Sequence, residues 1–200
     1  MKSQLLGNLK QGLLIAISAP AGTGKTTLVR KLIAELPQYV VQSISCTTRA
    51  LRPGEVDGKD YFFLTKDEFA RRKNNGEFIE TVSVFSADYG TLSATIANQR
   101  QGGKHVICVV DTYGALALKE KENARLIFLL PPSLATLKER LKKRKTESKE
   151  GLEERLERVH FELDQIKHFD YQVVNCDLEI ASQVLKSILI AEEHRLEPYT

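Results

Sequence analysis

Cysteines and histidines are scarce in this chain of 200 residues, and their spacing fits neither metal binding nor a catalytic triad. The three cysteines, Cys46, Cys108 and Cys176, lie far apart and make no pattern of metal ligands. Two of them look like buried strand residues, which favours a reducing compartment. The four histidines form no triad and no metal-ligand spacing, so we assign them no role.

Long hydrophobic runs and an excess of either charge are also missing. No apolar run approaches the length of a membrane span, and residues 1–7 lack the apolar core of a signal peptide. A net charge of +3 does not argue for nucleic acid as a partner, although it suits a substrate with several phosphates. We therefore expect one cytoplasmic domain, monomeric or homodimeric, that binds neither membrane nor nucleic acid.

The central feature that is present is a glycine-rich turn between a strand pattern and a helix pattern. Residues 13–17 form an apolar run typical of a buried strand, and residues 27–33 read as the start of a helix. The connecting segment reads Ala19-Pro20-Ala21-Gly22-Thr23-Gly24-Lys25-Thr26-Thr27. In this context it predicts a P-loop, in which backbone N–H groups and the positive end of the helix dipole bind phosphates.

The P-loop prediction assigns roles to two side chains, and the sequence departs from the P-loop pattern at one position. Lys25 can reach the β- and γ-phosphates of a nucleoside triphosphate, and the Thr26 hydroxyl can bind Mg²⁺. The pattern opens with glycine, whereas this chain has Ala19 there. A turn with a solvated lysine is the alternative, but its place at a strand-to-helix switch favours phosphate binding.

Strand and helix patterns alternate along most of the chain, which predicts an α/β fold with a parallel sheet flanked by helices. We expect strands over 39–45, 105–111, 125–130 and 171–176, and helices over 25–36, 93–101 and 178–190. Residues of the last helix that should face the core are Ile180, Val184, Leu185, Ile188 and Leu189. Asp111 should lie close to the P-loop, because ligands gather at the carboxyl ends of parallel strands.

Residues 45–63 form a turn-rich stretch that carries Arg49, Arg52 and Tyr61. Two guanidinium groups beside a phenol make a receptor for a second phosphate group, while a solvated hairpin with surface charges is the alternative. Glu80 follows as a carboxylate beside apolar residues. Residues 46–92 therefore predict a small lobe inserted into a core of residues 1–45, 93–140 and 160–200.

Residues 142–151 form a highly charged segment between two helical patterns, without an apolar anchor, and lie within a predicted lid from about 141 to 159. Such a composition predicts a helical lid that a charged ligand closes. Arg140, Arg144 and Arg155 are the residues that could close on phosphates. A solvated surface turn is the alternative interpretation.

Together these motifs resemble the guanylate kinase family, and the resemblance covers nearly the whole chain. The most specific part is residues 45–63, with Thr-Thr-Arg, an arginine three residues on, Gly-Glu, and then Gly-x-Asp-Tyr. Further matches lie at residues 76–80, at 89–91, at the strand that ends with Asp111, at Arg144-x-Thr-Glu, and at Asn175-x-Asp-Leu.

The resemblance implies ATP-dependent phosphorylation of GMP to GDP, with Mg²⁺ bound alongside ATP, and it implies a role for each matching residue. The implied GMP-binding residues are Ser45, Glu80, Thr91 and Asp111 for guanine, and Arg49, Arg52, Tyr61 and Tyr89 for the phosphate. The implied ATP-binding residues are residues 19–27, Arg140 and Asn175, the last near the adenine. The implied catalytic residues are Lys25, Arg49, Arg144 and Arg155.

One departure from the family keeps other interpretations open. The family usually has Asp-x-Asp-x-Gln-Gly where this chain has Val109-Val110-Asp111-Thr112-Tyr113-Gly114. The first aspartate, which supports the P-loop lysine and the Mg²⁺ site, is thus absent. A non-catalytic binding module of guanylate-kinase-like fold is one alternative, and a kinase for another nucleoside monophosphate is a second. Glu80 discriminates the second, because adenine lacks the N1–H that this carboxylate would accept.

Overall fold

The computed structural model describes residues 4–84, 86–143 and 159–196, apart from the side chains of residues 140–143. Its frame is a five-stranded sheet in the order β2-β7-β1-β8-β9. The strands are β1 (Leu14–Ser18), β2 (Val40–Ser43), β7 (His105–Val109), β8 (Arg125–Leu130) and β9 (Tyr171–Val174). Every pairing in it is parallel, which confirms the predicted sheet.

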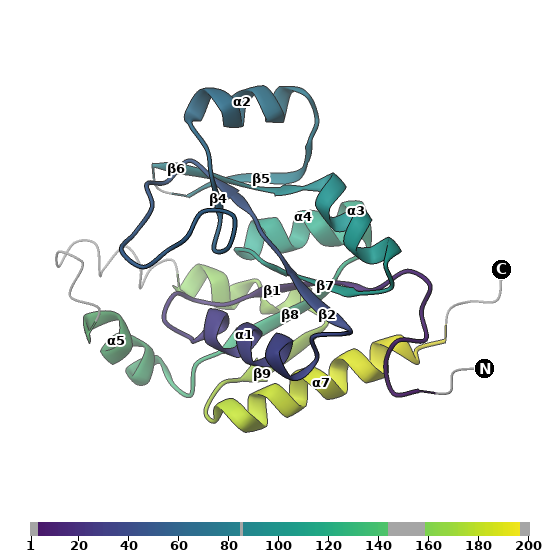
Figure 1. Cartoon of the computed structure of the whole chain (residues 1–200). Coiled ribbons are helices and arrows are strands. Elements are labelled where there is room, and N and C mark those ends of the chain that lie inside the picture. The colour runs from purple at the N-terminus through teal and green to yellow at the C-terminus, as the bar shows by residue number, and fades with distance from the viewer. Residues whose placement is uncertain (1–3, 85, 144–158, 197–200) are drawn as a thin grey trace.

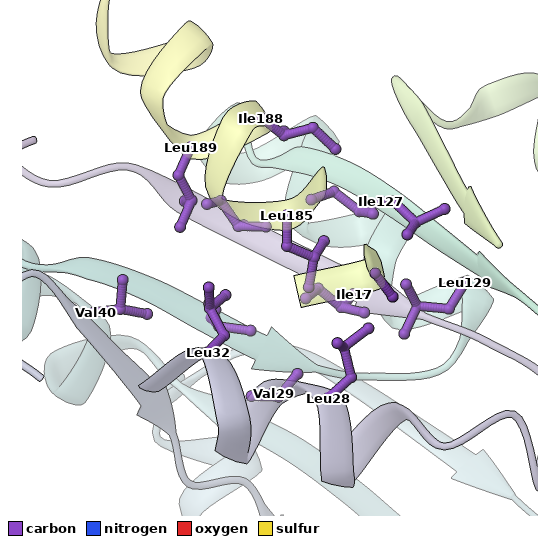
Figure 2. Close-up of a cluster of buried hydrophobic side chains, with 14 of the residues drawn as sticks. Ile17, Leu28, Val29, Leu32, Val40, Ile127, Leu129, Leu185, Ile188 and Leu189 are labelled. Carbon is purple, nitrogen blue, oxygen red and sulfur yellow. The ribbon is translucent and has the colours of Figure 1, made fainter. Parts of the chain in front are cut away.

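Helices cover both faces of this sheet (Figure 1). The helices on one face are α1 (Lys25–Glu35) and α7 (Leu178–Glu193), and those on the other are α3 (Ser93–Gln101) and α4 (Thr112–Glu122). Along β1, Ile15 and Ile17 pack with α1 and α7, as Figure 2 shows for Ile17, while Leu14 and Ala16 pack with the opposite cluster. Because both faces are buried, the strands read as continuous apolar runs.

Helix α7 buries a narrower stripe than the sequence predicts. Leu185, Ile188 and Leu189 are buried as expected, but Ile180 is 65% exposed and Val184 is 38% exposed. The prediction was wrong for those two residues. The stripe that faces the sheet is filled at 3.6-residue spacing by Ala181, Leu185, Ile188 and Leu189, which turns Ile180 and Val184 outward.

A second, four-stranded sheet in the order β4-β3-β6-β5 lies on the side of α3 and α4 (Figure 1). Its strands are β3 (Cys46–Thr47), β4 (Phe62–Phe63), β5 (Phe78–Val84) and β6 (Ala87–Leu92). Helix α2 (Lys66–Asn74) packs on it through Phe69, which stacks on Phe78. Thr65 caps α2 by accepting the Glu68 N–H at 3.2 Å. Strand β5 packs against α4, which connects the four-stranded sheet to the rest of the fold.

The remaining helical segments follow β8. They are α5 (Leu134–Lys143), helical residues 159–164, and the short helix η1 (Ile166–His168). The predicted lid lies outside the described residues, apart from the backbone of 141–143 and Val159. Within the described ranges, no helix is long and apolar enough to cross a membrane.

Candidate active site

The loop between β1 and α1 curls back on itself because two glycines adopt a backbone conformation that other residues avoid. The φ angles are 89° at Gly22 and 94° at Gly24. A Cβ atom added to Gly24 would lie only 2.7 Å from Nδ2 of Asn175. Helix α1 begins at the next residue, Lys25, so its N-terminus faces the space inside the loop. The geometry is that of the predicted P-loop.

Asn175 supports this loop from the core side. It follows β9, is 8% exposed, and its Nδ2 donates to the carbonyl oxygen of Thr23 at 2.8 Å. A buried amide that pairs with the loop backbone helps to fix the shape of the loop. The structure thus gives Asn175 a contact with the P-loop that the sequence analysis did not foresee.

A cavity of about 300 Å³ opens where the P-loop, the carboxyl end of β7 and strands β5 and β6 meet. The predicted site residues that line it are Ala19, Ala21, Lys25, Thr26, Ser45, Arg52, Tyr61, Glu80, Tyr89 and Asp111. The fold therefore brings residues of the P-loop, residues predicted to bind guanine or its phosphate group, and the carboxylate of Asp111 into one cavity. Ligand sites at this end of a parallel sheet are the rule.

Lys25 lines the cavity and contacts the main chain that follows β7. Its Nζ donates to the carbonyl oxygen of Val110 at 3.2 Å, directly after β7. Asp111 lies next in the chain, and β7 ends two residues before it, so the predicted strand over 105–111 was too long. Asp111 instead caps α4, because its Oδ1 accepts the Gly114 N–H at 2.9 Å.

Glu80 is a buried carboxylate in the cavity wall. Its residue is 5% exposed, and Oε1 accepts the hydroxyl of Thr91 at 2.5 Å. Oε2 is buried without a hydrogen-bond partner among the described residues. Burial, with a smaller effect from Asp111, raises the pKa of Glu80 to about 7. A cavity that holds such an oxygen is ready to receive hydrogen-bond donors.

The arginines and tyrosines predicted to bind a second phosphate group lie near one another at one side of the cavity. Arg52, Tyr61 and Tyr89 line the cavity, and the rings of Tyr61 and Tyr89 meet edge to face with centroids 5.9 Å apart. Arg49 is not among the residues that line the cavity, but its guanidinium lies 5.5 Å from the ring centroid of Tyr61, which does. Burial raises the pKa of Tyr61, so its hydroxyl stays a hydrogen-bond donor at neutral pH.

Residues 11–192 match the profile of the family described as guanylate kinase. The chain is also 51% identical over 190 residues to the guanylate kinase of Protochlamydia amoebophila, which covers 95% of this chain and 96% of that protein. The chain belongs to the guanylate kinase family.

Other guanylate kinases agree in sequence and in fold. The protein of Chlamydia trachomatis serovar D is 48% identical over 183 residues, which are 92% of this chain and 89% of that protein. A crystal structure of guanylate kinase from Anaplasma phagocytophilum superposes with a TM-score of 0.77 at 33% identity, covering 92% of this chain and 88% of that chain. The fold described above is therefore a guanylate kinase fold, and the chain is a kinase.

The structure accommodates both departures from the guanylate kinase pattern. Ala19 is 6% exposed and packs in the core with Leu28, and Asn123 is the single described non-glycine residue with positive φ, so position 19 does not need glycine. Val109 packs against the same core cluster and lines the cavity. Where the family pattern has a carboxylate near the P-loop lysine, this chain has an apolar side chain and the Val110 carbonyl.

Several predicted residues of the guanylate kinase pattern do not line the cavity. The loop residues Pro20, Gly22, Thr23, Gly24 and Thr27 shape the turn or begin α1, and Thr91 lies behind Glu80. Arg140 belongs to α5, but its side chain lies outside the described residues, as do Arg144 and Arg155.

Two charged residues that the sequence analysis left without a role lie at the site. Glu162 is 7% exposed and lines the cavity, and Glu55 pairs with Arg49. Glu55 stands three residues after Arg52 in the Gly-Glu pair of the family motif, and that spacing was its only signal in the sequence.

Proposed function

We propose that the described cavity is where this chain, an ATP-dependent GMP kinase by family, transfers the γ-phosphoryl group of ATP to GMP, forming ADP and GDP. The observation that carries the proposal is a single cavity lined by Lys25 of the P-loop, by Arg52 with two tyrosines, and by Glu80. The cavity thus contains groups that can bind a phosphate of each substrate and a group that can bind a base. Groups arranged in this way can position two substrates for in-line transfer.

On the ATP side, we assign residues 19–27 to the triphosphate, with Lys25 as the charge that follows the transferring group. The residues present fit Mg²⁺, because the Thr26 hydroxyl lines the cavity and offers a hard oxygen ligand of the kind that this ion prefers. Within the described residues no cluster of three or more His, Cys, Asp or Glu could hold a metal by itself. Mg²⁺ would therefore arrive with ATP and neutralise charge on its phosphates.

On the GMP side, we assign guanine to Glu80 with Thr91, Ser45 and Asp111. Guanine presents N1–H and N2–H₂ side by side, and one carboxylate can accept both. Oε2 of Glu80 lacks a partner in the described structure, so guanine would satisfy a buried acceptor that adenine would leave unpaired. Rejection of such an analogue reaches about 10⁴-fold in sites of this kind.

The phosphate of GMP is assigned to Arg49, Arg52, Tyr61 and Tyr89. It is largely a dianion at neutral pH, since its second pKa is about 6. It can attack without a general base, so positioning and charge neutralisation account for the catalysis. Arg140, Arg144 and Arg155 are proposed to close onto the transferring phosphoryl group. We also propose a cytoplasmic role in purine nucleotide metabolism, with the enzyme acting as a monomer or homodimer.

A coupled assay of ADP formation tests the proposal, with GMP, AMP, UMP and CMP offered in turn. We expect turnover with GMP and a large preference over AMP. The Lys25→Ala variant should lose turnover by about 10²-fold or more while remaining folded, because a donor aimed at developing charge is removed. Turnover with AMP but not GMP would refute the assignment. Calorimetry with Mg·ATP separates a binding module from a kinase, since a pure binding module should show no affinity for it.

A further inference from the structure

Arg49 is fixed by a carboxylate that comes from its own loop. Nη1 and Nη2 of Arg49 donate to Oε2 and Oε1 of Glu55 at 3.0 and 2.8 Å, so the carboxylate pairs with the terminal edge of the guanidinium. The side chains are only 15% and 21% exposed. A two-point pair of this kind fixes orientation as well as distance. Glu55 stays ionised, because its hydrogen bonds with Arg49 lower its pKa.

Three further contacts hold the same guanidinium. Nη1 also donates to the carbonyl oxygen of Ala50 at 2.6 Å, and the group lies over two rings, 5.5 Å from the centroid of Tyr61 and 5.6 Å from that of Phe63. The rings of Tyr61 and Phe63 meet edge to face with their centroids 5.9 Å apart. Arg49 is therefore packed in place rather than extended into solvent.

The hydrogen bonds of Arg49 to Glu55 and Ala50 do not use one edge of the guanidinium. A guanidinium has five N–H donors in a planar fork. The bonds to Glu55 and Ala50 use both donors of Nη1 and one of Nη2. Nε–H and the second Nη2–H remain, and they form the other two-point edge of the group. Hydrogen bonding to Glu55 and, more weakly, to Tyr89 raises the pKa of Arg49, so the Tyr89 hydroxyl lies beside this group.

Glu55 also fixes the turn that carries the second arginine. Oε2 accepts the backbone N–H of Arg52 at 2.8 Å, and the Glu55 N–H donates to the carbonyl oxygen of Arg52 at 3.0 Å. Arg52 lines the cavity from this turn. One carboxylate is thus bonded to the side chain of Arg49 and to the main chain of Arg52.

We propose that Glu55 is a positioning residue for the acceptor phosphate: it clamps the terminal edge of Arg49 and the turn at Arg52, so that the Nε edge of Arg49 and the Arg52 side chain face the phosphate together. This inference rests on the proposed function. The opposite role, in which Glu55 occupies Arg49 in place of a phosphate and must be displaced, predicts effects of the opposite sign.

The test compares Glu55→Gln and Glu55→Ala with the wild-type enzyme in steady-state assays. A glutamine can accept only one of the two Arg49 donors and turns an NH₂ group toward the other. We expect KM for GMP to rise by about tenfold in Glu55→Gln and further in Glu55→Ala, with kcat and KM for ATP nearly unchanged. The matched control is Glu68→Gln, which removes a similar carboxylate that pairs with Arg71 and Arg72 on α2.

Calorimetry with guanosine separates positioning from general loss of the lobe's structure. Guanosine lacks the phosphate, so its affinity should be the same in Glu55→Gln and wild type, whereas GMP affinity falls by about tenfold. An unchanged or lower KM for GMP in Glu55→Gln, or an equal loss for guanosine and GMP, would overturn the positioning role. A wild-type enzyme without activity on GMP would instead overturn the proposed function.

Discussion

The carboxylate of Glu80 is buried, and burial disfavours its ionised form. Its pKa of about 7 lies well above the ordinary value of 4.5, because the carboxylate is buried and Asp111 is close. Guanine donors would favour the ionised form, so binding of GMP should release a proton from the fraction of molecules in which Glu80 is protonated. The same residue can therefore set base preference, pH dependence and a cost in stability.

The first prediction concerns the pH dependence of substrate binding. Since only ionised Glu80 can accept N1–H and N2–H₂ together, KM for GMP should rise as pH falls below about 7, approaching about tenfold per pH unit. KM measured from about pH 5.5 to about pH 8.5 in wild type and in Glu80→Gln checks this. The phosphate of GMP titrates equally in both, so identical pH profiles for the two enzymes would contradict the role of Glu80.

The second prediction concerns stability, which should fall as pH rises, whereas the affinity for GMP should increase. The pKa of Glu80 is higher in the folded chain than in the unfolded chain, so the folded state binds the proton more tightly. Its contribution to stability is complete below about pH 4.5 and is lost as pH rises through about 7. Glu80→Gln should therefore be more stable than wild type at about pH 8, and this advantage should shrink toward about pH 5. Urea unfolding at both pH values measures the difference.

At the scale of elements, the P-loop depends on packing between its backbone and Asn175. The loop ends at Gly24, whose positive φ and lack of a side chain allow Asn175 to approach the Thr23 carbonyl. Thr23 and Asn175 are separated by 152 residues in the sequence, and one hydrogen bond connects them. The contact with Asn175 helps to hold the loop in its observed shape.

The third prediction tests this contact with Gly24→Ala. The new Cβ would lie 2.7 Å from Asn175 Nδ2. The alanine would also have to keep a positive φ, which by itself costs about 1–2 kcal/mol. We expect KM for ATP to rise more than KM for GMP. Gly76→Ala is the matched control, because Gly76 has a φ of 69° but no atom within 4 Å of its Cβ position. Equal effects of both variants on ATP binding would show that the contact with Asn175 is unimportant.

At the scale of the whole molecule, the cavity lies at one end of the parallel sheet, and the contacts that hold the N-terminal segment to α7 lie at the other end. Strand β7 begins at His105 and reaches the cavity at Val109. His105 is buried, its Nδ1 accepts the Leu13 N–H, and its Nε2 therefore donates to Glu193 at 2.8 Å. Glu193 also accepts the backbone N–H groups of Gly7 and Asn8, which ties the N-terminal segment to α7.

The fourth prediction follows from this separation. Glu193→Ala leaves His105 and the N–H groups of Gly7 and Asn8 without their acceptor, so the free energy of unfolding should fall by about 3 kcal/mol. KM for both substrates should stay the same, because the cavity lies at the far end of β7. The control is Glu179→Ala, an exposed partner of Lys31 that should cost less than about 1 kcal/mol. A large change in KM with little loss of stability would contradict this division of the molecule.

The sequence by itself determined the features that depend on neighbouring residues. The strand, turn and helix around the P-loop and the bounds of α3 and β8 were predicted correctly, because spacing, turn residues and apolar runs are local signals. The resemblance carried over nearly the whole chain, and it named ten of the residues that line the cavity. Strand ends and helix faces were less certain, as the early end of β7 and the exposed Ile180 show.

Only the tertiary structure decided how those side chains are paired and how strongly they hold protons. Three features depend on which segments meet and at what depth: the pairing of Arg49 with Glu55, the hydrogen bond from Lys25 to the Val110 carbonyl, and the Glu80 oxygen that has no hydrogen-bond partner among the described residues. Burial and hydrogen bonding act through space, so segments far apart in the chain set the pKa of Glu80 and the shape of the phosphate cradle. A local pattern can place a carboxylate on a strand, but only packing determines what surrounds it.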